Sequence, residues 1–216
     1  MEHGCKVMIV DDHPMVRQGC RILLESQHME ICAEADSGES ALKSLSNSEP
    51  DVAVVDLSME NMGGLEAISR ILSRSPQTRI VVFTMHDDPN ITMRAIKNGA
   101  RGYVTKSSPP DVLIEAIETV MDGGSYLSTD VAKTLAFNHH LTANSDPLES
   151  LTNREFDIFQ RLADGKSTSQ IADDLSLSKK SVSNYVVSIK HKLNACSLAD
   201  LIKFAITSGL STRNLN

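Results

Sequence analysis

The sequence predicts an α/β domain built on a doubly wound, five-stranded parallel sheet of order 2-1-3-4-5, followed by a small all-α helix-turn-helix domain. Short runs rich in β-branched residues alternate with amphipathic helical patterns over residues 1–123. The pattern over residues 151–216 is purely helical, whereas residues 124–150 lack a sustained period and are expected to be a linker. A chain of 216 residues is long enough for two domains that each bury a core.

Each predicted strand is followed by a helical pattern, which indicates a parallel sheet with helices on both faces. The strands are expected at Val7–Val10, Glu30–Ala35, Val52–Asp56, Ile80–Phe83 and Gly102–Thr105. The third run is apolar over four residues, as in a strand buried at the middle of a sheet. It ends in Asp56, and because a carboxylate is costly to bury, this position indicates a site rather than packing.

Local signals mark several helix boundaries. Asp88-Pro89 and Ser108-Pro109 each combine an N-cap residue with a proline suited to the first helical position, and Asn98-Gly99 is a helix stop. Within the predicted linker, Thr129–Phe137 could form a short helix. The helix after the fourth strand is therefore expected to begin at Pro89.

Four short helices are expected after the linker. A capping box at Thr152–Glu155 opens the first, and Gly165 ends it. The others are expected at Ser169–Leu175, at Lys179–Leu193 and from Leu198 to about residue 207. A tight turn at Ser176–Ser178, directly before the third helix, predicts a helix-turn-helix reader of DNA.

Charge is distributed unevenly along the chain. The formal net charge is −7, and residues 1–125 carry −8, residues 126–150 carry −2 and residues 151–216 carry +3. An acidic first part suits a bound cation, and a mildly basic last part suits a polyanion. The cysteines, at positions 5, 20, 32 and 196, show no metal-ligand spacing and are expected to be reduced, and His139-His140 has no third ligand nearby.

The sequence offers no membrane-directed segment. No apolar run approaches the roughly 18 residues that a membrane span needs. Residues 1–5 contain an acid and lack the apolar region of a secretory signal. We therefore expect a cytoplasmic protein without a membrane partner.

Acidic and polar residues follow several of the predicted strands. Asp11-Asp12 ends the first strand and Asp56 the third, so three carboxylates are expected at one edge of the sheet. Such carboxylates repel one another and favour a hard cation, and Mg²⁺ fits best. Thr84 and Lys106 end the fourth and fifth strands and add a hydroxyl and an ammonium, which completes a candidate phosphoryl site.

Each of these residues has a structural alternative. An Asp-Asp pair is more often a helix cap and turn, and Lys106 and Thr84 could be ordinary loop residues. Jointly they allow two functions: a carboxylate phosphorylated as a signal, or an aspartyl-phosphate intermediate in a phosphatase of the haloacid dehalogenase type. That phosphatase class has its nucleophile early, with an acid two residues later. Here the acid pair comes first and Asp56 is followed by Leu57-Ser58, which favours the signal.

Residues 6–123 resemble the receiver domain of bacterial two-component response regulators. The resemblance rests on Val10–His13, Val55–Met59, Gly63–Glu66, Phe83–His86 and Gly99–Lys106. It implies that Asp56 accepts a phosphoryl group from the phosphohistidine of a sensor histidine kinase. The family usually has proline where Glu60 stands, which adds a negative charge to the loop beside the site.

The same resemblance implies roles for the neighbouring residues. Asp11, Asp12, Asp56 and the backbone carbonyl of Ser58 would hold Mg²⁺. Thr84 and Lys106 would bind the phosphoryl group, and Tyr103 would rotate inward as the Thr84 hydroxyl moves. These residue roles come from the family and not from spacing.

The predicted helix Lys179–Leu193 has an apolar stripe and an opposite, mostly polar arc. The stripe holds Val182, Val186, Ile189 and Leu193, and the arc holds Lys180, Ser183, Asn184, Val187 and Lys190. In a major groove, Val187 could touch a thymine methyl while Ser183 and Asn184 bond base edges. Phosphate contacts would fall to Lys179, Lys180, Lys190 and Lys192. The alternative is a solvated helix face, which a charge of +3 does not exclude.

Residues 151–210 resemble the LuxR-type helix-turn-helix of the NarL/FixJ response regulators. The matching stretches are Leu151–Glu155, Ile171-Ala172, Leu177–Val182 and Lys192-Leu193. Lysine is frequent in that family where Ser183 stands, and histidine where Tyr185 stands, so the site preference of relatives is not carried over. Binding to double-stranded DNA that weakens with salt is expected.

Together these observations predict a transcriptional regulator and not an enzyme. Phosphorylation of Asp56 would shift a pre-existing equilibrium toward homodimers that bind paired DNA half-sites. Two alternatives remain: a phosphate-hydrolysing enzyme, and an interaction protein whose receiver domain regulates partners and whose DNA helix is not functional.

Overall fold

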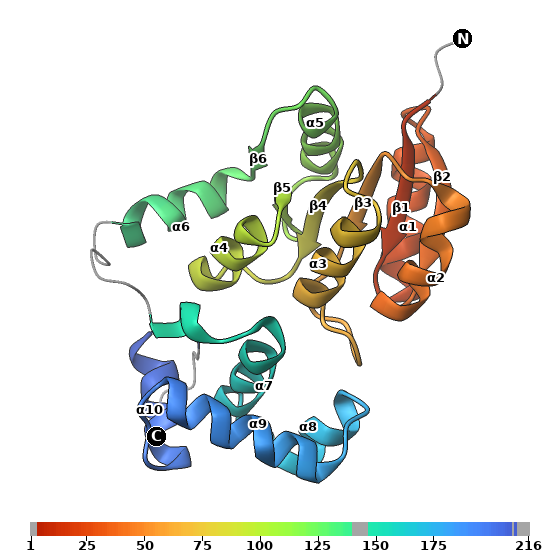
Figure 1. Cartoon of the computed structure of the whole chain (residues 1–216). Helices are drawn as coiled ribbons and strands as arrows, with labels where there is room; N and C mark the ends of the chain where they lie inside the picture. Colours follow the sequence, from red (N-terminus) through yellow and green to blue (C-terminus); the bar gives the residue numbers. More distant parts are fainter. Residues whose placement is uncertain (1–3, 140–146, 209, 211–216) are drawn as a thin grey trace. The chain divides into compact units, whose positions relative to one another are not determined.

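A computed structural model of the chain describes residues 4–139, 147–208 and 210 (Figure 1). The chain divides into two compact units, Met1–Asn138 and His139–Asn216. Each unit has its own core, as the length and the two patterns predict.

The first unit contains a parallel sheet whose strand order is β2-β1-β3-β4-β5-β6. The strands are β1 Lys6–Val10, β2 Glu30–Ala35, β3 Val52–Val55, β4 Arg79–Thr84, β5 Ala100–Thr105 and β6 Tyr126–Leu127. The predicted order 2-1-3-4-5 is confirmed for the first five strands. β3 is fully buried, as its apolar run indicates, because neighbouring strands flank it and helices cover the sheet.

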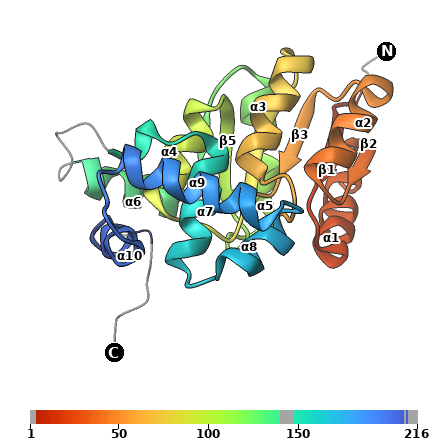
Figure 2. The same cartoon turned by 60° about the horizontal axis from the view of Figure 1, so that its bottom comes forward.

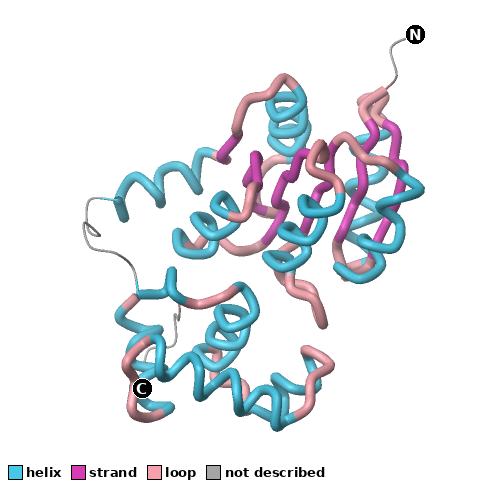
Figure 3. The backbone as a smooth tube through the Cα atoms, in the orientation of Figure 1, coloured by secondary structure: helices cyan, strands magenta, loops and turns pink. Residues whose placement is uncertain are grey.

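Five helices alternate with the strands and cover the sheet from both sides (Figures 1 and 3). They are α1 Pro14–Glu25, α2 Gly38–Ser48, α3 Gly64–Arg74, α4 Pro89–Lys97 and α5 Pro110–Met121. α1 and α5 cover one face, where Cys20, Leu24, Leu113 and Ile117 join Val7, Ile9, Val54 and Val104 in one apolar cluster. The carboxyl ends of β1, β3, β4 and β5 therefore meet at one edge of a rigid sheet.

The structure corrects the predicted number of strands. β6, within the predicted linker, extends the sheet to six strands by pairing in parallel with Gly102 and Tyr103 of β5. Two residues are too short for a periodic signal, so the sequence pattern missed this strand. A helix, α6 Thr129–His139, follows β6, and the first compact unit extends to Asn138.

Helix boundaries follow the local signals with one exception. Asp88 caps α4 by accepting hydrogen bonds from the backbone of Asn90 (2.8 Å) and Ile91 (3.3 Å). Gly99, after the end of α4, has a positive φ of 101°, as a helix stop requires. The start predicted for α5 is wrong by one residue, because Pro110 rather than Pro109 takes the first helical position.

The second unit is helical. A 3₁₀ turn at Pro147–Ser150 precedes α7 Asn153–Ala163, α8 Thr168–Asp174, α9 Lys179–Lys192 and α10 Leu198–Thr207. α7, α8 and α10 begin with capping boxes, which satisfy backbone N–H groups that the helix leaves unpaired. α9 packs against both α7 and α8 (Figure 2), and the tight turn between α8 and α9 includes Ser176 at a positive φ of 49°.

Within the described residues, no helix has both the length and the hydropathy that crossing a membrane requires.

Candidate functional site

The predicted carboxylates meet at the carboxyl edge of the sheet, around one ammonium group. Lys106 Nζ lies 2.6 Å from Asp11 Oδ2 and 2.8 Å from Asp56 Oδ2. The Asp11 and Asp56 side chains are only 4% and 1% exposed, and the Asp12 side chain beside them is 24% exposed. Lys106 therefore neutralises part of the charge of two buried acids.

Lys106 stays charged in this setting. Burial alone would lower the pKa of its ammonium, but the hydrogen bonds and charges of Asp11 and Asp56 outweigh that effect and hold the pKa above its ordinary value. The Lys106 backbone N–H also donates to the Thr84 carbonyl at 2.8 Å, which ties the end of β5 to the end of β4. Lys106 is thus held in place both by its backbone and by its side-chain ammonium.

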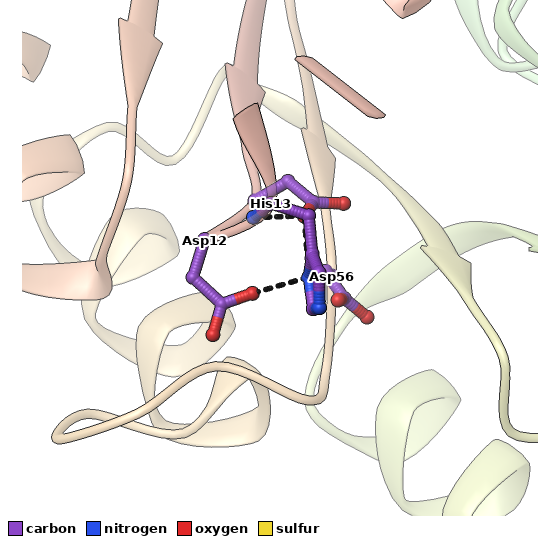
Figure 4. A group of neighbouring side chains, drawn as sticks. Asp12, His13 and Asp56 are labelled. Atoms are coloured by element: carbon purple, nitrogen blue, oxygen red, sulfur yellow. Dashed lines mark hydrogen bonds and ion pairs between the residues drawn. The ribbon is translucent and has the colours of Figure 1, made fainter. Parts of the chain in front are cut away.

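His13 adds a nitrogen to this carboxylate group. Its Nδ1 lies 2.6 Å from Asp12 Oδ1 and 3.3 Å from Asp11 Oδ1, and its backbone N–H donates to Asp11 Oδ1 at 2.8 Å. Figure 4 shows Asp12, His13 and Asp56 gathered beyond the ends of the strands that carry them. One potential ligand atom from each of these four residues lies within 4.8 Å of the others.

The loop after Asp56 is held close to the site by its backbone. The Ser58 N–H donates to Asp56 Oδ1 at 3.2 Å, and the Gly64 N–H donates to the Leu57 carbonyl at 3.3 Å. A Cβ at Gly64 would lie 2.2 Å from the Asp56 carbonyl oxygen, so only glycine fits where α3 begins. Glu60 in this loop is exposed to solvent.

The predicted switch residues are buried beside the site. Thr84 is fully buried, and its Oγ1 accepts a weak hydrogen bond from the His86 N–H at 3.4 Å. Tyr103 is also fully buried, and its hydroxyl donates to the His86 carbonyl at 3.0 Å. The rotation predicted for Tyr103 stays a prediction, and burial raises the pKa of its phenol.

The residues present fit a hard divalent cation. The three carboxylates carry more negative charge than one lysine neutralises, and they converge from two strand ends. Carboxylate oxygens are the protein ligands that Mg²⁺ prefers. The donor set therefore suits Mg²⁺.

The surface of α9 in the second unit follows the predicted wheel. Val182 and Ile189 are fully buried, Leu193 is 8% exposed, and Val186 is half-buried. On the opposite arc, Lys180, Ser183 and Asn184 are exposed, Val187 is 67% exposed, and Lys190 is half-buried. Lys179 is exposed at the start of the helix.

Lys192 differs from the other lysines of α9. Its Nζ lies 2.6 Å from Oε2 of Glu155, whose relative exposure is 5%. The other oxygen of Glu155 accepts a hydrogen bond from Ser188 at 2.6 Å. Lys192 thus joins α9 to α7 inside the unit, a contact that a helical wheel cannot predict.

No site role was predicted for three residues at these two places, His13, Gly64 and His191, although the first two lie in stretches that carry the receiver resemblance. His13 directly follows the acid pair, so adjacency was a usable signal. His191 is exposed and follows Val187 by four residues, a spacing that puts both on one helix face. The role of Gly64 depends on the path of the loop, and no local pattern reveals it.

Comparison with known proteins gives two matches along the chain. Residues 7–118 match the response regulator receiver domain, and residues 149–205 match the bacterial regulatory proteins of the luxR family. The chain belongs to the response regulators. The transcriptional activator protein ExaE of Pseudomonas putida is 36% identical over 94% of this chain and 97% of its own length.

Solved structures of response regulators share this fold. A LuxR-family response regulator from Aurantimonas sp. SI85-9A1 is 37% identical over 64% of this chain and 99% of its own, with a TM-score of 0.62. The response regulator RcsB in a DNA complex is 25% identical over 95% of this chain and 99% of its own, with a TM-score of 0.60. This chain is thus a receiver domain joined to a LuxR-type DNA-binding domain.

Proposed function

We propose that this response regulator is a cytoplasmic, phosphorylation-controlled regulator of transcription, in which Asp56 accepts a phosphoryl group from a sensor histidine kinase. The observation that carries the proposal is the position of Lys106 Nζ, within 2.8 Å of both Asp11 and Asp56 at the edge of the sheet. An ammonium held there can pair with the carboxylate before phosphoryl transfer and with a phosphoryl oxygen after it.

The reaction needs a nucleophile, a charge clamp and a place for the phosphoryl oxygens. An Asp56 carboxylate oxygen would form a bond to phosphorus as the phosphorus–nitrogen bond of the donor breaks. Lys106 and the Thr84 hydroxyl would bind the transferred group. Tyr103 would couple the movement of the Thr84 hydroxyl to the surface of the domain. Tyr103 is suited to that role because its hydroxyl bonds the loop that begins after Thr84.

We assign the cation site to Asp11, Asp12, Asp56 and the backbone carbonyl of Ser58, with Mg²⁺ as the cofactor. Bound Mg²⁺ would neutralise charge on the phosphoryl oxygens. Asp11 and Asp12 would orient the cation beside Asp56. The excess of carboxylate over ammonium charge supports this assignment.

The DNA-binding part of the proposal rests on α9. We propose base contacts from Ser183, Asn184 and Val187, whose side chains are exposed on one face. Phosphate contacts are assigned to Lys179, Lys180 and Lys190. Lys192, which the sequence pattern placed with them, is bound to Glu155 and fits a structural role better.

Three further points belong to the proposal. The functional division would be a receiver at 1–123, a linker at 124–150 that includes β6 and α6, and a DNA-binding domain at 151–216. Phosphorylated chains would form homodimers on double-stranded DNA, and no membrane partner is expected. The protein would not act as an enzyme on an external substrate.

Genome-wide footprinting with Asp56 intact and with Asp56→Ala tests this function. We expect the variant to lose most occupied sites under conditions that activate the kinase, and Glu39→Ala, an exposed acid of the same unit, to keep them. Identical occupancy with and without Asp56 would contradict phosphorylation control. Absence of any footprint, or turnover of a small phosphoester, would instead favour the interaction-protein or the phosphatase alternative.

Lys180→Ala is expected to weaken binding to any duplex and to reduce its salt dependence. Because each phosphate contact releases about 0.9 counterion, the negative slope of log K against log salt should become less steep by about 0.9. Binding is measured with a random-sequence duplex at several salt concentrations. Lys203→Ala, an exposed lysine of α10, is the matched control, and an equal fall in both variants would argue against a role for α9.

A further inference from the structure

The exposed face of α9 has an uncharged centre between two ends that can carry charge. Along this face, Lys180 is followed by Ser183, Asn184 and Val187, and then by His191. At 100° per residue these five side chains lie within an arc of about 100°. Lys180 and His191 are eleven positions apart, or about 16.5 Å at 1.5 Å per residue, which exceeds the roughly 12 Å width of a major groove by about 4 Å.

This spacing places the uncharged centre over base edges and the ends near the phosphates. Guanine is most often read by arginine or lysine through two hydrogen bonds to O6 and N7. Residues 181–189 contain neither residue type. The middle turn of α9 therefore lacks the usual means of selecting guanine.

The hydroxyl of Ser183 is already used as a donor. Its Oγ donates to the Lys179 carbonyl at 2.9 Å, one turn back along α9. The oxygen lone pairs remain for a partner in the groove, so Ser183 acts there as an acceptor. The major groove offers such donors on the amino groups of adenine and cytosine.

Val187 lies one turn after Ser183 and is 67% exposed, among the largest exposed fractions of the apolar side chains described. Against a cytosine amino group or a guanine oxygen, its methyl groups would leave a polar atom without a hydrogen bond. Against thymine, they would meet the methyl group at C5. The chemistry of this position therefore favours thymine.

We propose that the middle turn of α9 reads an A·T pair: Val187 packs on the thymine methyl, Asn184 bonds adenine N6 and N7, and Ser183 accepts from an amino group. This inference rests on the proposed DNA-binding function and names the sequence class that it selects. Lys180 and His191 would flank the pair toward the two phosphate strands.

The first step of the test is selection of bound duplexes from a random-sequence pool by the full-length protein. We expect an enriched half-site with an A·T pair at its centre. Each thymine of the selected duplex is then replaced singly by uracil, which lacks the methyl group. One replacement should weaken binding about fourfold, the effect of exposing one buried methyl-sized group.

Variants assign that effect to Val187. Val187→Ala should bind the thymine and uracil duplexes equally. Val187→Ile, which keeps a branched apolar side chain, should bind the thymine duplex more tightly, as the wild type does. Leu198→Ala, which alters an exposed apolar residue of α10, should keep the wild-type ratio.

Two results would overturn the inference while leaving DNA binding intact. One is a selected site with a G·C pair at its centre, and the other is a wild-type protein that binds every uracil duplex as well as the thymine duplex. Failure to enrich any sequence, together with no binding to any duplex, would contradict the proposed function itself.

Discussion

Asp56→Asn is expected to abolish phosphorylation of this protein by a small phosphodonor such as acetyl phosphate. The amide cannot act as the nucleophile, and the two neighbouring acids are already paired with other groups. Asp11 shares Lys106 with Asp56, while Asp12 lies beside His13. Incorporation should fall from as much as one phosphoryl group per chain to the background, since a nucleophile acts in an all-or-none manner.

The variant should remain folded, so that loss of phosphorylation reports on chemistry. Asparagine has nearly the same shape as aspartate, and Lys106 Nζ, which lies 2.6 Å from Asp11 in the wild-type chain, can still pair with that acid. Removing one of three clustered negative charges also relieves repulsion when no cation is bound. Intact-protein mass spectrometry measures the added phosphoryl group, thermal unfolding checks the fold, and Glu39→Gln is the control.

A phosphorylated Asp56→Asn protein would contradict the assignment and point to another acceptor. Hydroxylamine cleaves acyl phosphates and leaves phosphoesters intact, so it identifies the class of any remaining acceptor. Loss of the phosphoryl group from wild-type protein in hydroxylamine is the result expected for a carboxylate.

The sheet edge was predictable because its signals are local in the sequence. Apolar runs of β-branched residues fix the strands, and a polar residue at a strand end lies at the carboxyl edge in any doubly wound sheet. For this reason the sequence alone places Asp11, Asp56 and Lys106 at one edge of the sheet. Contacts between helices carry no such signal. A helical wheel marks Lys192 as polar, but its partner Glu155 lies 37 positions away.

Two other features of the structure escaped prediction because they also depend on contacts between distant parts of the chain. β6 has two residues and forms only because β5 offers a free edge, so its pairing depends on tertiary structure. Glu155 was predicted as part of a capping box, and it does accept from the Thr152 N–H at 2.8 Å. Its second role, as the acid bound to Lys192, appears only when α7 and α9 pack.

Glu155→Gln is expected to destabilise the second unit by about 2 kcal/mol at pH 7. Glu155 Oε2 lies 2.6 Å from Lys192 Nζ, and its Oε1 accepts from Ser188 at 2.6 Å. Burial alone would raise the pKa of this carboxyl, but the hydrogen bonds from Lys192, Ser188 and Thr152 outweigh it and lower the pKa to about 2. A fall of that size from 4.5 corresponds to at most about 3 kcal/mol at about 1.4 kcal/mol per unit, and solvent around the partly exposed Lys192 ammonium reduces this to about 2 kcal/mol.

The lowered pKa of Glu155 also makes the destabilisation by Glu155→Gln depend on pH. A carboxyl whose pKa is lower in the folded state stabilises the fold fully above its unfolded pKa, and this contribution is lost as the pH falls through the folded pKa. The stability difference between wild type and Glu155→Gln should therefore be constant above about pH 5 and should shrink between pH 4.5 and pH 2. Hydrogen exchange over α7 and α9 of the full-length chain measures it in the unit concerned.

Matched variants separate the ion pair from a general loss of charge. Asp173→Asn, at an exposed acid of α8 in the same unit, should change stability by less than about 0.5 kcal/mol. Lys192→Met should be destabilising, and combining it with Glu155→Gln should cost less than the sum of the two, because each single change leaves the other partner alone. Strict additivity would show that Lys192 does not depend on Glu155. Its ammonium would then be available to a DNA phosphate, and Lys192 would rejoin Lys179, Lys180 and Lys190 as a contact.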